Sequence, residues 1–362
     1  MIRVLALFAA LLTALPAQAQ NDNRRWEVEF HLGALTGTDP ISGSGRLPDP
    51  LPAAPLGFPI SGMTSAPVVT SWFFGEGARL MQVMGAFLVR GATPFVPLDA
   101  VLTRGDARYA TGMSAGARLG ARFGGRWRAE LAVDYGASRL QIADDALQQF
   151  EASRSTFAEV FNRSLLFLGA QSASATMSAD NGDARAVVTM ASIARDLPGA
   201  RGVVPYLRAG AGVTSTIGQE PTVQLEGEYT FRFMGGVSPT PLAQRDAVSV
   251  RYRQSQHTFT WSAGGGARID VSPRWLVRVD ASVVVSRPES QITVAAANSS
   301  QPLPSAQSGS ATILGTTPPI VFSTFTSARS TLSGPPLQDF VTFSGKSTQT
   351  RLNVTAGLGF RF

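Results

Sequence analysis

The strongest constraint in this sequence is a two-residue alternation of apolar with polar or small side chains in its last segment. From Leu352 to Phe362 every second residue is apolar, and the residues between them are Asn, Thr, Gly or Arg. Successive side chains of a β-strand point to opposite faces, so this pattern predicts a strand with one apolar face. A soluble β-sandwich has the same period. The alternation alone therefore does not decide whether the apolar face meets a protein core or lipid.

Six other segments repeat this alternation. Tight turns at Gly124-Gly125, around Pro198-Gly199 and at Ser272-Pro273 then place one further strand, at residues 184–195. Amphipathic segments of roughly ten residues, joined alternately by short turns and long connections, are typical of transmembrane β-barrels. We therefore predict an all-β fold, a transmembrane antiparallel up-and-down barrel of about eight strands, with long outer loops and one short helix. The predicted strands are residues 26–35, 109–123, 126–138, 184–195, 202–216, 257–271, 274–286 and 348–362.

The composition agrees with strands whose apolar faces meet lipid. Only 15% of the residues are charged and 44% are hydrophobic, yet no continuous apolar run forms a transmembrane helix. Soluble proteins average about a quarter charged residues. The chain contains no Cys, which excludes a disulfide scaffold, a thiolate metal site and a Cys nucleophile, and its two His leave little scope for zinc. We predict no metal and no cofactor.

Residues 1–19 are typical of a cleaved secretory signal peptide. Arg3 precedes an apolar stretch from Val4 to Leu15, and the small-residue triplet Ala17-Gln18-Ala19 follows. The stretch is shorter than the roughly 20 apolar residues that span a bilayer. We expect cleavage near Ala19, which leaves one barrel domain at residues 20–362.

A terminal aromatic residue that closes an amphipathic strand resembles the assembly signal of Gram-negative outer-membrane β-barrels, here Phe360 and Phe362. With the signal peptide, this resemblance implies a location in the cell outer membrane. It also implies contact with outer-membrane lipid and lipopolysaccharide, and recognition of the last strand by the barrel-assembly machinery. In architecture the chain resembles small OmpA-like and OmpW-like porin-family barrels, without a motif that assigns a member.

Four long segments outside the predicted strands are expected to form large outer loops, at residues 36–108, 139–183, 217–256 and 287–346. The first holds an apolar stretch at residues 80–89 that fits either a helix or a strand. The second carries a helical pattern. Its apolar residues near one face are Leu147, Phe150, Phe157, Phe161 and Leu165.

The third long segment leaves the strand count open. Two further alternating patterns begin at Val223 and Val248. They fit either a hairpin that extends two strands above the membrane or two more spanning strands. A ten-strand barrel keeps the even number, so parity does not decide. We favour eight because Glu226, Glu228 and Arg232 would make the inner face of the first pattern polar. In addition, Gln254, Ser255 and Gln256 break the phase before His257.

If the apolar faces meet lipid, the alternating polar residues point into the barrel. Eight strands enclose an interior that side chains can just fill. The simplest interpretation is a core of ion pairs, because unpaired buried charge is costly. The alternative is a narrow, Arg-lined path that favours anions. The predicted interior ionisable residues are Glu27, Glu29, His31, Arg118, Arg122, Arg128, Glu130, Asp134, Arg208, Arg268, Arg278, Asp280 and Arg351.

The function predicted from these features is a non-enzymatic structural or surface-interaction role, with a narrow porin-like channel for small anionic solutes as the alternative. A lipid-modifying barrel enzyme is the third hypothesis. His257 lies near Ser255 and Ser262, and His31 lies near Glu29, but neither set matches a catalytic motif. The Arg residues are spread through the strands without a basic run, so no nucleic-acid partner is predicted. The sequence identifies no surface ligand.

Overall fold

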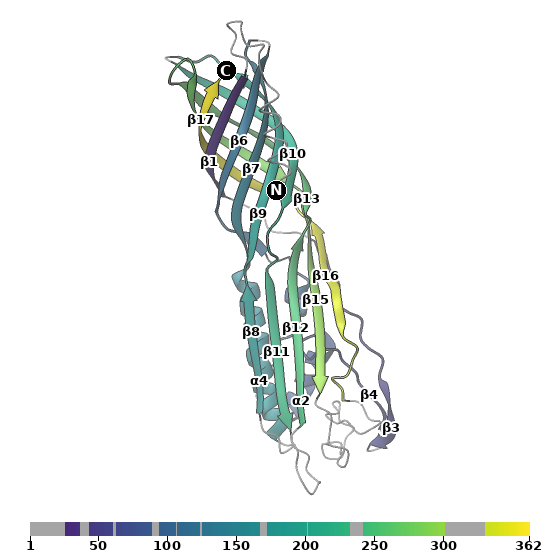
Figure 1. Cartoon of the computed structure of the whole chain (residues 1–362). Helices are drawn as coiled ribbons and strands as arrows, with labels where there is room; N and C mark the ends of the chain where they lie inside the picture. The colour runs from purple at the N-terminus through teal and green to yellow at the C-terminus, as the bar shows by residue number, and fades with distance from the viewer. Residues whose placement is uncertain are drawn as a thin grey trace.

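The computed structural model describes residues 26–36, 43–60, 63–88, 94–105, 107–123, 125–166, 172–200, 202–231, 242–300 and 330–362. The predicted signal peptide, residues 1–19, lies outside these ranges. Within them the chain forms a closed barrel and a second sheet that continues part of the barrel wall (Figure 1).

Eight antiparallel strands form the barrel. Each pairs with two neighbours, and the β1–β17 and β7–β9 ladders close the cylinder. This confirms the prediction of eight spanning strands and excludes the ten-strand alternative. The barrel strands are β1 (Trp26–Thr36), β6 (Gly112–Phe123), β7 (Trp127–Ile142), β9 (Gly182–Asp196), β10 (Val203–Thr216), β13 (His257–Asp270), β14 (Trp275–Ser286) and β17 (Gln349–Arg361).

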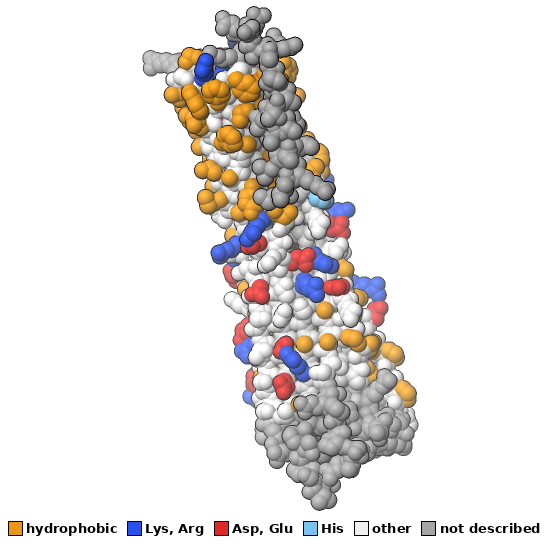
Figure 2. Space-filling model, in the orientation of Figure 1, with side chains coloured by type: hydrophobic (Ala, Val, Ile, Leu, Met, Phe, Trp, Pro, Cys, Tyr) orange, Lys and Arg blue, Asp and Glu red, His pale blue; other side chains and the backbone are white. Residues whose placement is uncertain are grey.

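The outer surface of the barrel is apolar. Phe30, Met113, Leu207 and Phe259 are each more than half exposed, and Figure 2 shows hydrophobic side chains over this part of the molecule. Apolar groups exposed in such number on one surface mark a region that meets lipid or a partner. A closed barrel satisfies its backbone hydrogen bonds between strands, so it can cross a bilayer. The barrel therefore has the architecture of a transmembrane β-barrel.

The second sheet extends one side of the barrel beyond the apolar surface. Its five long strands follow or precede β9, β10, β13, β14 and β17 with at most five residues between, and they keep the same neighbour order. We call this sheet, with the helices against it, the extension. Its strands are β2 (Ser44–Gly45), β8 (Ser172–Asp180), β11 (Thr222–Phe231), β12 (Leu242–Gln254), β15 (Glu289–Ser300) and β16 (Leu337–Lys346).

Three helices and three short strands complete the described chain. Helix α4 (Asp144–Leu166) packs on β8 and β11, and α2 (Gly75–Leu88) packs on α4. Phe157 of α4 stacks on Phe161 with ring centroids 4.3 Å apart, and Phe161 stacks on Tyr229 of β11 at 4.5 Å. No helix in these ranges is long and apolar enough to cross a membrane. The remaining elements are α3 (Asp99–Leu102), β3 (Ala54–Ile60), β4 (Met63–Ala66) and β5 (Ala107–Tyr109).

The apolar face changes sides between the barrel and the extension. In β10 the apolar side chains point outward, whereas in β11 Val223, Leu225 and Tyr229 are fully buried against the helices. Gln224 and Glu228, between them, are exposed. Lipid favours an apolar exterior and water favours an apolar interior. This inversion marks the junction of the two sheets as one boundary of the membrane.

The four segments expected to be outer loops are largely regular structure in the extension. The predicted helix is α4, which at 23 residues is not short. Residues 80–88 of the ambiguous apolar stretch belong to α2, and Val89 lies outside the described residues. The two extra patterns of the third segment are β11 and β12, which continue β10 and β13 as a hairpin above the membrane. The fourth segment contains β15 and β16. Its Ser, Thr and Pro content concealed them, and shifts in the β15–β16 register interrupt their alternation.

Candidate functional site: the charged barrel interior

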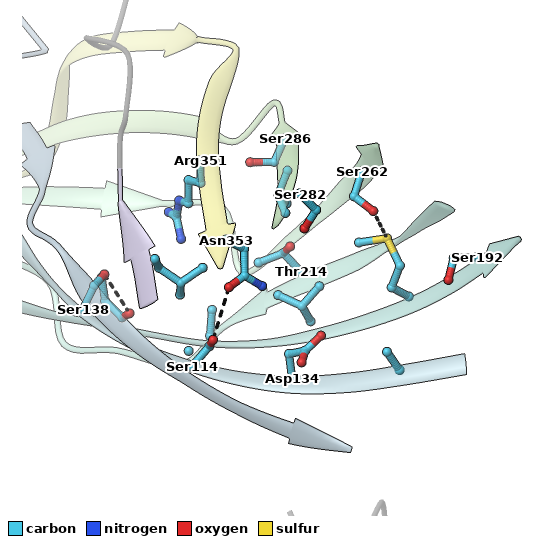
Figure 3. Close-up of a pocket in the computed structure, with 18 of the residues that line it drawn as sticks. Ser114, Asp134, Ser138, Ser192, Thr214, Ser262, Ser282, Ser286, Arg351 and Asn353 are labelled. Carbon is cyan, nitrogen blue, oxygen red and sulfur yellow. Dashed lines mark hydrogen bonds between the residues drawn. The ribbon is translucent and has the colours of Figure 1, made fainter. Parts of the chain in front are cut away.

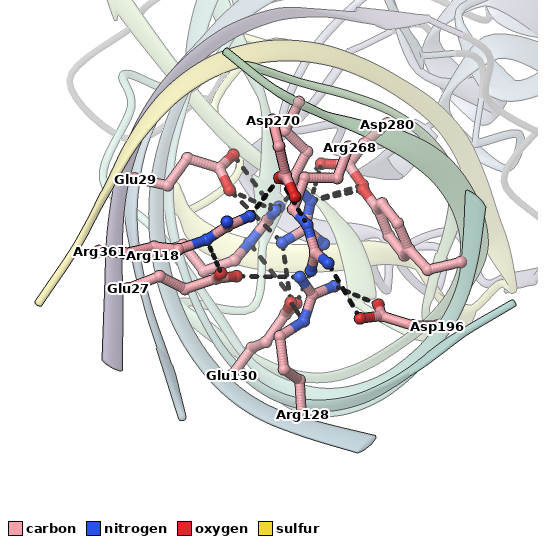
Figure 4. Close-up of polar contacts among 12 residues, drawn as sticks. Glu27, Glu29, Arg118, Arg128, Glu130, Asp196, Arg268, Asp270, Asp280 and Arg361 are labelled. Atoms are coloured by element: carbon pink, nitrogen blue, oxygen red, sulfur yellow. Dashed lines mark hydrogen bonds and ion pairs between the residues drawn. The ribbon is translucent and has the colours of Figure 1, made fainter. Parts of the chain in front are cut away.

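The structure places all thirteen predicted interior residues inside the barrel. Nine are buried, and Arg122, Asp134, Arg208 and Arg351 are half-buried. They divide between the two ends of the barrel. Most lie at the end with the short turns, where they form one cluster with Asp196, Asp270 and Arg361 (Figure 4). We call this cluster the plug. Its members are Glu27, Glu29, Arg118, Arg122, Arg128, Glu130, Asp196, Arg268, Asp270, Arg278, Asp280 and Arg361.

Arg278 of β14 lies at the centre of the plug. Its guanidinium is fully buried and donates two parallel hydrogen bonds to Glu130 of β7, with Nη1–Oε1 2.7 Å and Nη2–Oε2 3.2 Å. Its Nη1 also lies 3.4 Å from Glu29, and its Nε lies 3.2 Å from Asp280. Asp280 lies on the same strand as Arg278, but β7 and β14 are not neighbours, so the contact with Glu130 crosses the barrel. Bidentate charge-assisted bonds of this kind are the strong ones.

Two more buried arginines link the same carboxylates into one network. Arg118 Nη1 lies 3.0 Å from Asp280 and 3.2 Å from Glu29. Arg128 Nη1 donates to Glu27 at 2.9 Å, and its Nε lies 3.2 Å from Glu130. Each carboxylate therefore faces at least one arginine, as a buried charge requires.

The rest of the plug lies toward the strand ends. Arg268 Nη2 donates to Asp196 at 3.1 Å, and Arg361 donates to Asp270. Arg122 interacts electrostatically with its neighbours in this group. Six arginines thus face six carboxylates, so their formal charges cancel. The plug closes this half of the barrel as a core of zero net formal charge. Among the described residues, every plug arginine except Arg122 forms an ion pair with a carboxylate.

Tyr206 of β10 is the aromatic centre of the plug. It is buried, donates to Asp280 and accepts a hydrogen bond from Arg278 Nε. The guanidinium carbon atoms of Arg278 and Arg128 lie 4.3 Å and 5.1 Å from its ring centroid. Gly266 makes room for it, because a Cβ there would lie 2.6 Å from the tyrosine hydroxyl. The ring thus holds two like charges close together by cation–π attraction.

The other half of the barrel interior is less densely filled. A cavity of about 60 Å³ lies there, with hydroxyl and amide side chains in its wall (Figure 3). His31 contacts Asp134 at its edge, and Gly116 between them leaves the space that this contact needs. Ser114 donates to Asn353 at 3.3 Å. This half of the barrel is polar and holds room for a few water molecules.

Sequence reasoning missed four members of this interior: Asp196, Asp270, Arg361 and Tyr206. All four lie on the polar phase of the alternation, at or near strand ends. Asp270 and Arg361 already lay on the polar phase of the predicted strands at residues 257–271 and 348–362, and extending the predicted strand at residues 184–195 by one position would have reached Asp196. Tyr206 was already on the predicted inner face, but its aromatic ring suggested no role there.

Of the two histidine groupings considered from the sequence, the structure brings together only that of His31 with Glu29. His257 Nδ1 lies 3.0 Å from Ser215 Oγ at an exposed position, and among the described residues no hydrogen bond joins it to Ser255 or Ser262. His31 Nδ1 lies 3.7 Å from Glu29, as the sequence suggested, but its other nitrogen meets Asp134. No cluster of three potential metal-ligating His, Cys, Asp or Glu occurs in the described ranges.

A separate buried acid, Asp246, lies in the core of the extension. It accepts hydrogen bonds from Ser71 Oγ at 3.0 Å and from the backbone N of Trp72 at 2.7 Å. Its other oxygen, Oδ1, is buried without a hydrogen-bond partner. Burial raises the pKa of this carboxyl to about 7, against the lowering effect of the two hydrogen bonds.

Among known proteins, this chain is similar only at low identity and low TM-score to the solved outer-membrane proteins described next. No known protein family and no curated protein matches the sequence. Among solved structures, the chain is similar to the outer membrane protein OprG from Pseudomonas aeruginosa, with 10% identity and a TM-score of 0.32 over 93% of this chain and 96% of that one.

Two further solved structures are similar over most of their length. An outer membrane channel from Pseudomonas putida F1 has 10% identity and a TM-score of 0.22, over 95% of this chain and 99% of that one. The Pseudomonas putida toluene transporter TodX has 8% identity and a TM-score of 0.20, over 98% and 93%. At these values the likeness carries no argument about function. The closed barrel and its apolar exterior themselves give this chain the architecture of an outer-membrane β-barrel.

Proposed function

We propose that this chain is a non-enzymatic outer-membrane protein whose closed barrel anchors the extension at the cell surface, where the extension makes the interactions. The observation that carries the proposal is the neutral plug. Arg278, Arg128 and Arg118 lie 2.7–3.8 Å from buried carboxylates inside the barrel, so an ion entering the lumen would have to separate buried pairs. Separating such pairs is costly in a low-dielectric interior.

The orientation follows from the lengths of the connections. Short turns join β6 to β7 and β13 to β14 at one end of the barrel, and the extension lies at the other. Short turns are periplasmic in this class. The extension then projects from the outer face of the membrane, and the plug lies on the periplasmic side. The last strand, with Phe360 and Phe362, would present the assembly signal at the periplasmic end.

Lipopolysaccharide is the partner that the junction supports best. Arg139, Arg185 and Arg287 are exposed where the barrel meets the extension. In the proposed orientation this level is that of the outer-leaflet headgroups, whose phosphates attract guanidinium groups. The ligand of the extension itself stays unassigned.

A narrow anion channel is the second candidate, supported by the half-buried Arg208 and Arg351 in the less filled half of the barrel.

Recording from the purified protein in planar bilayers separates the two functions. We expect no stable unitary current from the wild type, because the plug blocks the lumen. The double variant Glu130→Ala/Arg278→Ala removes its central pair and is expected to show openings.

The matched control is Glu226→Ala/Arg245→Ala, which removes an ion pair from the exposed face of the extension. It should be as silent as the wild type. Stable unitary current steps from the wild type would contradict the closed-barrel proposal and support the channel.

A separate measurement tests the enzyme hypothesis. Lipid profiles of cells carrying the wild type and His257→Ala should be identical, and a difference between them would support a lipid-modifying activity.

A further inference from the structure

The cavity in the less filled half of the barrel has an electrostatic imbalance that the plug does not have. Its wall contains two arginines, Arg208 and Arg351, and one carboxylate, Asp134. Asp134 is engaged by His31. Among the described residues, neither Arg208 nor Arg351 forms an ion pair with a carboxylate. Arg278 at the centre of the plug, by contrast, contacts three.

Arg208 of β10 is the clearest case. Among the described residues its one hydrogen bond is a long contact from Nη2 to Ser282 Oγ, at 3.4 Å. The charged groups that act on it are Arg118, Arg278, Glu130 and Asp134. Glu130 already receives two hydrogen bonds from Arg278, so it is committed elsewhere. The guanidinium thus carries an unneutralised charge inside the barrel.

Arg351 of β17 repeats the imbalance on another part of the wall. Its Nη2 donates to Gln349 at 3.4 Å, while its Nε is buried with no hydrogen-bond partner. Its guanidinium lies 3.9 Å from the ring centroid of Tyr109, which holds its orientation. Tyr109 donates to Gln254 at the same end. An aromatic contact offsets part of the charge but supplies no oxygen acceptor.

Hydroxyl and amide groups elsewhere in the wall can act as neutral donors. Ser192 and Ser262, on the two strands that flank β10, line the cavity together with Thr214 and Asn353 (Figure 3). Hydroxyl groups rotate to donate to whichever acceptor occupies the cavity. A guanidinium presents a planar fork of donors that matches carboxylate, phosphate and sulfate oxygens.

We propose that this cavity binds one small oxyanion, of the size of inorganic phosphate, sulfate or acetate, with Arg208 as its principal ligand. The anion supplies the missing counter-charge, and the hydroxyl groups complete its coordination. A volume of about 60 Å³ suits such an ion. The site lies between the plug and the extension. Anion binding there therefore does not require that ions pass through the whole barrel.

Calorimetric titration of the folded protein in detergent with sodium phosphate, sulfate and acetate tests this site. We expect saturable binding to the wild type. Arg208→Gln should weaken it by at least about tenfold, because a charge-assisted hydrogen bond is lost. Arg245→Gln makes the same change on the exposed face of the extension and should leave binding unchanged. Equal affinity in the wild type and Arg208→Gln would overturn the proposal.

A second measurement covers the case in which Arg208→Gln does not fold. Crystals of the wild type soaked in bromide should show an anomalous peak within hydrogen-bond distance of the Arg208 guanidinium. A cavity without that peak contradicts the site. Stable currents in planar bilayers would contradict the closed-barrel proposal but would not affect the bromide peak or the anion titration. The two proposals can therefore fail separately.

Discussion

Replacing Arg278 by alanine is expected to lower the free energy of unfolding by about 3–5 kcal/mol, the cost of leaving buried charges without their partner. The guanidinium is fully buried and contacts three carboxylates, two of them on other strands across the barrel. Its removal leaves Glu130 with only Arg128 and Arg118 as cations. Urea unfolding of the protein folded into lipid vesicles measures the change.

Two comparisons make this result specific to the plug. Arg278→Lys keeps the charge but loses the bidentate geometry, so its stability should lie between those of the wild type and Arg278→Ala. Arg245→Ala removes an arginine from an exposed pair with Glu226 and should cost at most about 1 kcal/mol. Equal losses from Arg278→Ala and Arg245→Ala would show that the plug contributes no more than a surface ion pair.

The stability of the extension is expected to fall between pH 4 and pH 7 because of Asp246. Its folded-state pKa, about 7, is raised above the usual 3.8 by burial. The folded protein therefore keeps a proton over this range that the unfolded chain has released. Stability is highest below about pH 4 and falls as the pH rises through the window, by about 4 kcal/mol for this one group.

Asp246→Asn should abolish this pH dependence, since an amide does not titrate. The contact with Trp72 makes the measurement direct, because Trp72 is the one tryptophan outside the barrel strands and reports unfolding of the extension by fluorescence. Glu228→Gln, on the exposed face of β11, is the control and should keep the wild-type slope. A wild type whose stability is constant across the window would contradict the assignment.

The barrel was predictable because each strand carries its own information. The alternation in β17 and β13 indicates which face of each strand is apolar. Because lipid surrounds the barrel, the apolar face points outward. The strand positions and the inward direction of Glu130 and Arg278 follow from this local rule. Their contact does not, because it joins strands on opposite sides of the barrel and depends on the register of all the strands between them.

The extension was less predictable because its contacts are not local. Phe157 and Phe161 indicated a helix with an apolar face, but nothing in the sequence named β11 as the surface it covers. β15 and β16 pair with register shifts, so their apolar residues do not follow a strict period of two. The same limit applies to the prediction of the cavity arginines, Arg208 and Arg351. Their inward position follows from the sequence, but their lack of a carboxylate partner depends on how the interior packs.

Cysteine labelling in intact cells tests most directly whether a lipid-facing barrel carries an extension outside the cell. The chain has no Cys, so each variant introduces a single reactive group. The three positions are Gln224 on the exposed face of the extension, Leu207 on the apolar surface of the barrel, and Arg126 in the short β6–β7 turn.

A membrane-impermeant maleimide should label Gln224→Cys on intact cells, and Arg126→Cys only after the outer membrane is permeabilised. Leu207→Cys should react only once detergent and heat have unfolded the barrel. Labelling of Leu207→Cys on intact cells, or identical behaviour of Gln224→Cys and Arg126→Cys, would contradict the account.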